Sequence, residues 1–308
     1  MGTDIDKEEF DERDYARFAE RLEECLTVLG RLLDRPGFGA GPATVGAELE
    51  LFLIDSAART LPHNQAIRAA VADPRVTVEL NRFNLELNAT PALLADRPFA
   101  TLGGELNLLV DRVTHAARDY GGRVAVIGIL PTLGLTDLGP GAMTDLPRYR
   151  VLDEGLRRLR QDRFRVRIAG EHPLELATAD VALEGANSSF QVHLRVAPGD
   201  FMRTYNAVQL ATAPVLAVSG NSPAFLGHRL WETTSAKGRL AVGCLIAGSH
   251  PDAATPSSPL LTDICIRPGR RSRAGRARWR RDRGEEFADL FGGDPDAVDR
   301  EHRQREGA

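Results

Sequence analysis

Two glutamates lie two residues apart in VGAELELFLID, residues 45–55, a stretch that is otherwise typical of a buried β-strand. Side chains two apart on a strand share a face, so Glu48 and Glu50 would project together, about 6 to 7 Å from each other. Such a pair of carboxylates can bracket a cation. The alternative is a half-exposed strand whose polar residues face water.

A second acidic stretch, ELNRFNLELN (79–88), alternates between polar and apolar residues. Alternation places Glu86 on one face with two asparagines and the apolar residues on the other. Glu79 precedes Glu86 by seven positions, an odd number. Glu79 therefore joins Glu86 on the same face only if the chain bends near Asn81 and Arg82.

A third stretch, ANSSFQVHLRV (186–196), directs Gln191, His193 and Arg195 to one face. A lone histidine on a strand is often structural, but polar groups on one face of three strands favour a shared site. Carboxylates with at most one imidazole suit Mg²⁺ or Mn²⁺ better than zinc. This pattern is typical of a site that holds a nucleotide triphosphate through divalent cations.

Hydrophobic periodicity predicts the elements that must position these residues. Strands and helices are mixed without regular βαβ alternation, which predicts an α+β fold with a largely antiparallel sheet and helices packed on one face. Cys25 lies in the apolar stripe of the helix expected over residues 9–34, so we expect it in the core. Helices are expected over 9–34, 64–72, 98–120, 146–160 and 200–218, and extended segments over 45–54, 76–89 and 123–132, with 163–168 and 189–196 as a strand pair.

Composition limits the classes of protein to which the chain could belong. The chain has 43% apolar residues, no long uninterrupted apolar run and an acidic N-terminus unlike a signal peptide, so we expect a cytoplasmic protein without a membrane partner. All of the 39 basic residues except Lys7 and Lys237 are arginine, so the chain has neither a P-loop lysine motif nor a kinase strand lysine. Three scattered cysteines indicate neither a disulfide framework nor a zinc site.

Six motifs follow one another along the chain: GAELELFLID, ELNRFNLEL, GILPTL, PRYRVL, FQVHLRV and GNSPAFLGHRLW. This ordered set resembles the glutamate–cysteine ligase type 2 family of carboxylate–amine ligases. The resemblance covers roughly residues 15–231, and no single motif in it is decisive. It implies a glutamine-synthetase-like catalytic fold.

The resemblance also implies a reaction and the residues that carry it. ATP would activate a glutamate γ-carboxylate as an acyl phosphate, which an amine such as that of cysteine then attacks, as in glutathione biosynthesis. Arginine suits the binding of a substrate carboxylate because its planar fork pairs bidentately with it. By position, the family's metal ligands correspond to Glu48, Glu50, Glu79, Glu86 and His193. Its substrate-binding candidates are Arg148, Tyr149 and Arg195, and Arg229 is a candidate for substrate binding and catalysis.

The C-terminal part departs from the family pattern at about Glu232. Family members continue into a late strand with a Glu-x-Arg pair, and we find no such strand here. Instead, residues 267–283 hold nine arginines. Three interpretations are open: an arm that binds nucleic acid, a solvated disordered linker, or a shifted reading frame of GC-rich DNA. We favour the frame shift and do not expect a nucleic-acid partner.

We therefore predict a catalytic domain over residues 1–231, incomplete at its C-terminal side, and an unrelated, disordered tail over 232–308. The predicted function is an ATP- and Mg²⁺-dependent carboxylate–amine ligase with small-molecule substrates. Without the late Glu and Arg, its activity is expected to be weak or absent. The alternatives are an inactive remnant that at most binds nucleotide or metal, and a metal-dependent hydrolase that uses the same carboxylates.

Overall fold

The computed structural model describes residue 5 and residues 7–159, 163–230 and 265–266. All of these residues lie within one compact unit of the chain, Met1–Arg267. The predicted boundary at residue 232 and the predicted disordered tail lie outside the described residues, apart from a short strand at Cys265–Ile266. They stay predictions.

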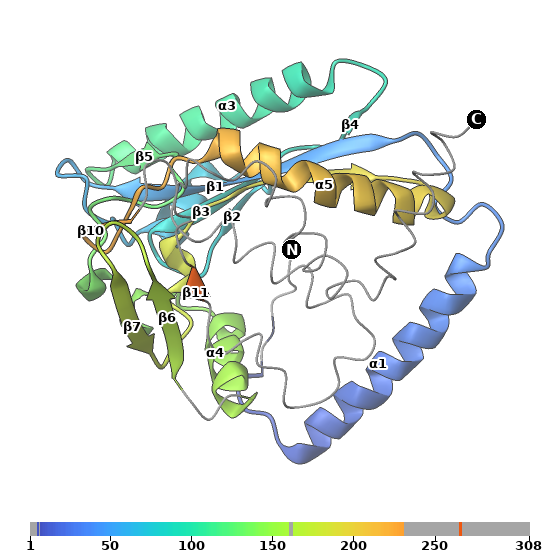
Figure 1. Ribbon diagram of the computed structural model, residues 1–308, viewed down its shortest axis with the longest axis horizontal. Helices are drawn as coiled ribbons and strands as arrows, with labels where there is room; N and C mark the ends of the chain where they lie inside the picture. Colours follow the sequence, from blue (N-terminus) through green and yellow to red (C-terminus); the bar gives the residue numbers. More distant parts are fainter. Residues whose placement is uncertain (1–4, 6, 160–162, 231–264, 267–308) are drawn as a thin grey trace, which may run out of the picture. The chain divides into compact units, whose positions relative to one another are not determined.

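The described elements form an α+β fold, as the sequence predicts. Short 3₁₀ turns connect several of these elements. The helices are α1 (Glu12–Leu33), α2 (Asn64–Val71), α3 (Pro98–Arg118), α4 (Pro147–Leu159) and α5 (Phe201–Ser219) (Figure 1). The strands are β1 (Thr44–Ile54), β2 (Val76–Val78), β3 (Asn84–Asn88), β4 (Ala92–Leu93), β5 (Arg123–Ala125), β6 (Phe164–Ile168), β7 (Leu174–Thr178), β8 (Phe190–Arg195), β9 (Ala224–Phe225), β10 (His228–Arg229) and β11 (Cys265–Ile266).

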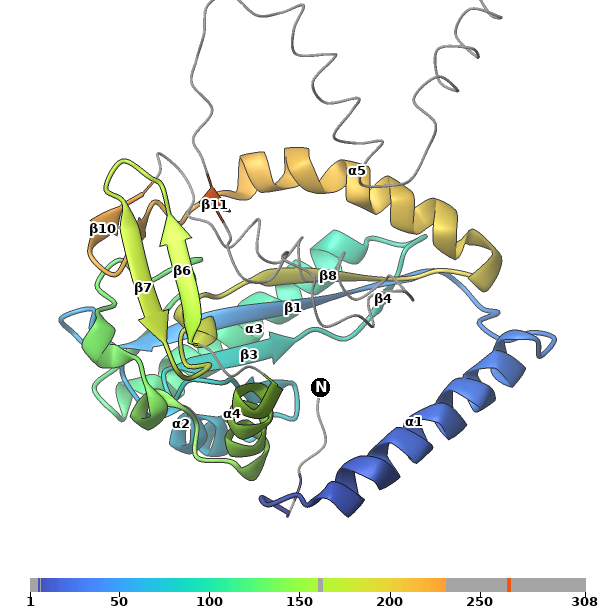
Figure 2. The same ribbon diagram turned by 60° about the horizontal axis from the view of Figure 1, so that its bottom comes forward.

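The central sheet is six-stranded and antiparallel, and β1 is its organising strand. β1 pairs with β3, β4, β5 and β8, and β2 pairs with the outer side of β3. β1 is long and rich in Leu, Phe and Ile, residue types that fit a pleated, packed surface. Figure 2 shows β1, β3 and β8 running side by side.

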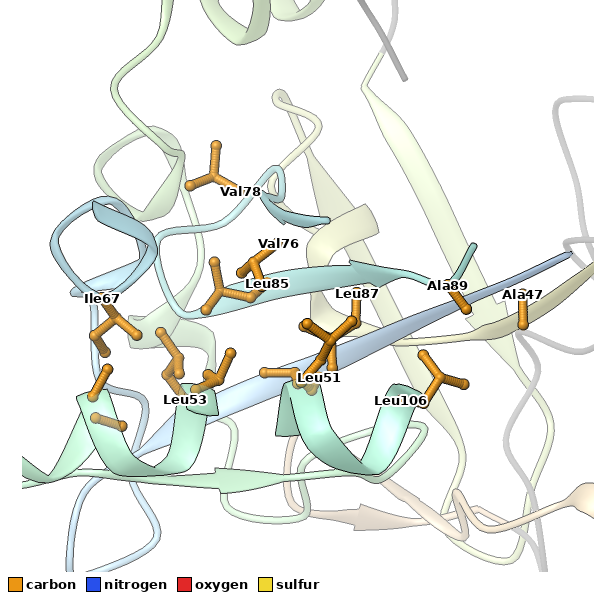
Figure 3. Close-up of a cluster of buried hydrophobic side chains, with 14 of the residues drawn as sticks. Ala47, Leu51, Leu53, Ile67, Val76, Val78, Leu85, Leu87, Ala89 and Leu106 are labelled. Atoms are coloured by element: carbon orange, nitrogen blue, oxygen red, sulfur yellow. The ribbon is translucent and has the colours of Figure 1, made fainter. Parts of the chain in front are cut away.

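One face of this sheet carries the main hydrophobic core. Leu51 and Leu53 of β1 and Leu85 and Leu87 of β3 are completely buried there, against apolar side chains of α2 and α3 (Figure 3). α3 supplies Leu102, Leu106, Leu109 and Val113 at helical spacing, so a single stripe of the helix meets the sheet. The predicted packing of helices on one face is confirmed for α2 and α3.

Two strand predictions need correction. The predicted pair of 163–168 and 189–196 does not form: β6 pairs with β7, whereas β8 pairs with β1 in the central sheet. The periodicity of a segment reports which residues share a face, and it carries no information about the partner strand. The predicted strand over 123–132 is extended only at Arg123–Ala125, where three residues pair with the end of β1.

The first helix departs from its expected packing. α1 begins with a capping box, in which Asp11 accepts from the Asp14 amide and Asp14 accepts from the Asp11 amide. It has no buried residue, and Phe18 and Leu26 of its apolar stripe are more than half exposed. Cys25, expected in the core, is exposed. In the described residues, no helix combines the length and apolar character needed to cross a membrane.

The contact between α3 and the sheet yields a direct test with two adjacent leucines. Leu109 is 0% exposed, whereas Leu108 is 47% exposed on the same helix. Leu109→Ala should lower the free energy of unfolding by about 2 to 5 kcal/mol through lost burial and a cavity. The matched Leu108→Ala should change it by less than about 0.5 kcal/mol. Urea unfolding measures both, and equal losses would show that α3 does not pack as described.

Candidate functional site

Carboxylates line the face of the sheet opposite the main core. In the antiparallel pair β1–β3, Glu50 lies directly across from Glu86, and Glu48 lies across from Asn88. Cβ atoms of directly opposed residues are about 4.5 to 5.5 Å apart, and like charges in such positions repel. The register therefore brings two carboxylates together from separate strands, as the alternating sequence predicts for this face.

The turn between β2 and β3 brings a third carboxylate to the same place. β2 ends at Val78 and β3 begins at Asn84, so the chain bends at the point that the spacing of Glu79 and Glu86 requires. The amide of Asn84 donates to the carbonyl of Asn81 across this turn, over 2.9 Å. The Glu79 carboxyl then interacts electrostatically with those of both Glu86 and Glu50. We call Glu50, Glu79 and Glu86 the acidic cluster.

The acidic cluster changes the proton affinity of Glu79. Burial, followed by the negative charges of Glu86 and Glu50, raises the pKa of Glu79 from 4.5 to about 7.

Phe52, two residues beyond Glu50 on the same face, is completely buried and stacks on Phe83, with the ring centroids 6.2 Å apart. A hydrophobic cluster therefore borders one end of the carboxylate face.

Neighbouring polar groups orient two of the three carboxylates. Glu50 accepts hydrogen bonds from the amide and the hydroxyl of Ser189, both at 2.9 Å. Glu86 accepts from the Thr77 hydroxyl at 3.0 Å and from the Asn88 side chain at 2.8 Å. Sequence reasoning missed Ser189 and Thr77. The sequence does contain a signal for Thr77. It lies two residues before Glu79, and side chains two apart on a strand share a face.

His193 reaches the carboxylate face from β8. It lies opposite Gly46 of β1, and Gln191 lies opposite Glu48. The Nε2 atom of His193 is 3.5 Å from a carboxylate oxygen of Glu48, and its side chain is half exposed. The five predicted metal-ligand residues thus come from three adjacent strands and one turn of a single sheet.

Arg148 and Tyr149, predicted to bind substrate, lie beside the acidic cluster at the start of α4. The Tyr149 hydroxyl donates to the carbonyl of Val78 at 3.0 Å, and Arg148 donates to the same carbonyl at 3.2 Å. The Arg148 guanidinium stacks on the Tyr149 ring, 4.6 Å from its centroid. Burial, then the charge of Glu79, raises the pKa of Tyr149 to about 12, so the hydroxyl stays protonated at neutral pH.

The two remaining predicted arginines, Arg195 and Arg229, bond to parts of the chain outside the acidic cluster. Arg195, at the end of β8, donates to the carbonyl of Ala40 over 2.7 Å. Arg229, in β10, forms an exposed ion pair of 3.1 Å with Glu171. The roles of both residues, like those of the other predicted site residues, stay predictions.

The residue set near the acidic cluster fits a hard divalent cation. Carboxylate oxygens are the ligands that Mg²⁺ and Mn²⁺ prefer. The pKa of Glu79 is raised first by burial and then by the charges of Glu86 and Glu50, and a cation would offset those charges. Both polar side-chain atoms of Asn84, which is 2% exposed, have no hydrogen-bond partner. Within the described residues, no three His, Cys, Asp or Glu side chains already converge in the arrangement of a metal site.

One comparison with known proteins gives a match. The model of the family described as glutamate-cysteine ligase family 2 (GCS2) matches residues 44–235, which is more than half of the 308 residues. The matched range begins with β1 and includes the acidic cluster, His193 and the other predicted site residues. No curated protein matches the chain.

The raised pKa of Glu79 predicts a pH-dependent cost of folding. The folded pKa of about 7 exceeds the unfolded 4.5, so the folded chain binds the proton more tightly. Below pH 4.5 the carboxyl is protonated in both states and costs nothing. Stability is lost as the pH rises from 4.5 to 7, and above that the loss is complete, at up to about 3 kcal/mol.

Glu79→Gln removes this cost because the amide does not ionise. Without divalent cations, the variant should unfold at higher urea than the unsubstituted chain at pH 8 and show no such gain at pH 4. Glu154→Gln, an exposed change on α4, is the matched control and should give no gain at either pH. A Glu79→Gln difference that is the same at pH 4 and pH 8 would contradict the raised pKa.

Proposed function

The chain belongs to glutamate–cysteine ligase family 2, and we propose that it is an ATP- and Mg²⁺-dependent carboxylate–amine ligase. Its substrates would be glutamate, activated at the γ-carboxylate as an acyl phosphate, and an amine such as that of cysteine. The observation that carries the proposal is the acidic cluster. Glu50 and Glu86 lie opposite each other on the sheet face away from the core, and the adjoining turn brings Glu79 within electrostatic range of both.

The residues of the acidic cluster, with Glu48 and His193, would hold Mg²⁺ or Mn²⁺. When bound, the cation offsets the charge of the ATP phosphates and so allows them to approach the protein's carboxylates. The strands fix Glu48, Glu50 and Glu86 through the backbone ladder, so little reorganisation is needed when nucleotide binds. Ser189 and Thr77 hold the carboxylates of Glu50 and Glu86 in a defined orientation.

Arginines would bind the carboxylates of the amino-acid substrate. Arg148 and Tyr149 lie nearest to the acidic cluster, because both bond to the carbonyl of Val78, the residue before Glu79. Arg195 shares the face of His193 on β8, two residues further along. Arg229 is also proposed to bind the substrate carboxylate and to act in catalysis, for which it would have to leave its exposed pair with Glu171.

We further propose that turnover is low. Family members supply a late Glu-x-Arg pair on a strand, and in the sequence of residues 232–308 we recognise no strand-like stretch that carries such a pair. Loss of one charge that stabilises a transferring phosphoryl group costs about a hundredfold or more in rate. The alternative is an inactive remnant. Unlike a slow ligase, it would at most bind Mg²⁺ or ATP and would form no product.

The proposal is tested by binding and by product formation with the full 308-residue chain. Calorimetry should show ATP binding that requires Mg²⁺ or Mn²⁺, and mass spectrometry should detect slow formation of a γ-glutamyl product that requires glutamate, amine and ATP. Glu86→Gln should weaken the cation-dependent binding about tenfold or more, because it removes one ligand charge. Glu154→Gln, exposed on α4, should leave it unchanged.

Each other outcome has a defined meaning. No cation-dependent nucleotide binding would contradict the proposal. Binding without product would identify the inactive remnant. Phosphate release that needs no amine acceptor would indicate a hydrolase, and rapid turnover would refute the proposed impairment.

A further inference from the structure

A buried polar pair lies under the turn that carries Glu79. This turn, residues 79–83, connects β2 to β3 and is called the Glu79 turn below. The pair consists of Asn64, the first residue of α2, and Thr144, three residues before α4. Both residues are 1% exposed, although they are 80 positions apart in the chain. Neither belongs to the predicted site.

Asn64 binds the Glu79 turn through both its side chain and its backbone. Its Nδ2 atom donates to the carbonyls of Asn81 and Asn84, over 3.1 and 3.2 Å. Its backbone amide donates to the carbonyl of Arg82 over 3.0 Å. The same Nδ2 atom lies 2.8 Å from the Thr144 hydroxyl, to which it also donates, so its two hydrogens are shared among three acceptors. One residue therefore contacts three carbonyls at or next to the turn.

Thr144 extends this network to Glu79 itself. Its hydroxyl, which accepts from Asn64, donates to the main-chain carbonyl of Glu79. Its amide donates to the carbonyl of Leu80 over 2.7 Å. Asn64 and Thr144 together thus bind the carbonyls of five consecutive or adjacent residues: Glu79, Leu80, Asn81, Arg82 and Asn84.

This arrangement opposes the repulsion within the acidic cluster. Glu50 and Glu86 sit on strands, where the ladder fixes the backbone, but Glu79 sits on a turn. A turn with free carbonyls could rotate the Glu79 carboxylate away from its two negative neighbours and into water. Buried hydrogen bonds to the turn's carbonyls resist such a rotation, because breaking them would leave polar groups without partners.

We propose that Asn64 and Thr144 are positioning residues that hold Glu79 in the acidic cluster in the absence of cation. This inference rests on the proposed function, since it assigns the network to the cation site of that function. A purely structural network would lower stability when broken and would leave cation affinity unchanged. A positioning network links the two, because supporting contacts around metal ligands change metal affinity by about 10- to 100-fold.

The test compares three variants of the full chain. Thr144→Val removes the hydroxyl at nearly constant volume, whereas Thr144→Ser keeps it. Val113→Ala weakens the main core at α3, on the opposite face of the sheet, and serves as a control for lost stability. Calorimetry and electron paramagnetic resonance measure Mn²⁺ binding, and thermal unfolding without Mn²⁺ measures stability.

We expect Thr144→Val to weaken Mn²⁺ binding about tenfold or more. Thr144→Ser should bind Mn²⁺ as the unsubstituted chain does. Val113→Ala should also retain the affinity, even if its melting temperature falls as far as that of Thr144→Val. This combination of results would separate an effect on the position of Glu79 from a general loss of stability.

Two results would overturn the inference, and they are distinguishable. If the unsubstituted chain binds Mn²⁺ and Thr144→Val binds it equally well, the network is structural and the proposed function stands. If the unsubstituted chain binds no Mn²⁺, the cation site of the proposed function fails, and the inference fails with it. Should Thr144→Val not fold, the same comparison is made with Asn64→Gln and Asn64→Ala, of which only the glutamine keeps an amide that can donate to the Thr144 hydroxyl.

Discussion

Repulsion among Glu50, Glu79 and Glu86 is the constraint around which the described structure is arranged. The register of β1 and β3 places two of these carboxylates directly opposite each other, and the turn before β3 adds the third. A chain selected for stability alone would separate them or place a basic residue between them. Burial and mutual charge instead raise the pKa of Glu79 to about 7. Ionised Glu79 therefore lowers the free energy of unfolding when no cation is bound.

The opposite face of the same sheet offsets that cost. Leu51, Leu53, Leu85 and Leu87 lie on the face opposite the carboxylates and are completely buried against α2 and α3. Each fully buried leucine contributes about 1.5 to 3 kcal/mol relative to an exposed one. A slip of one residue between β1 and β3 would turn the leucines to the carboxylate face and the glutamates into the core. The hydrophobic face therefore fixes the register on which the acidic cluster depends.

The sequence predicted the local features well because alternation and helical periodicity are local signals. The polar faces of β1, β3 and β8, the bend between Glu79 and Glu86 and the helices α1 to α5 follow from it. β6 pairs with the next strand along the chain, β7, for which no strand was predicted. The pairing of β8 with β1 joins segments that are far apart in the chain, so no local signal predicts it. The same holds for Asn64 and Thr144, since a single Asn at a helix start and a single Thr in a loop have many ordinary roles.

The candidate site therefore joins two kinds of support. Glu48, Glu50 and Glu86 are held by strand pairing, which any break in the sheet would disturb along with the whole fold. Glu79 is held by side chains from α2 and from the segment before α4, so its position depends on contacts that the sheet does not need. Because Tyr149 and Arg148 bond to Val78 at the start of this turn, substrate residues and cation residues would meet at the one carboxylate whose backbone lies outside the strands. If the cation binds as proposed, the turn that carries Glu79 is the place where substrate binding at α4 would alter the geometry of the cation site.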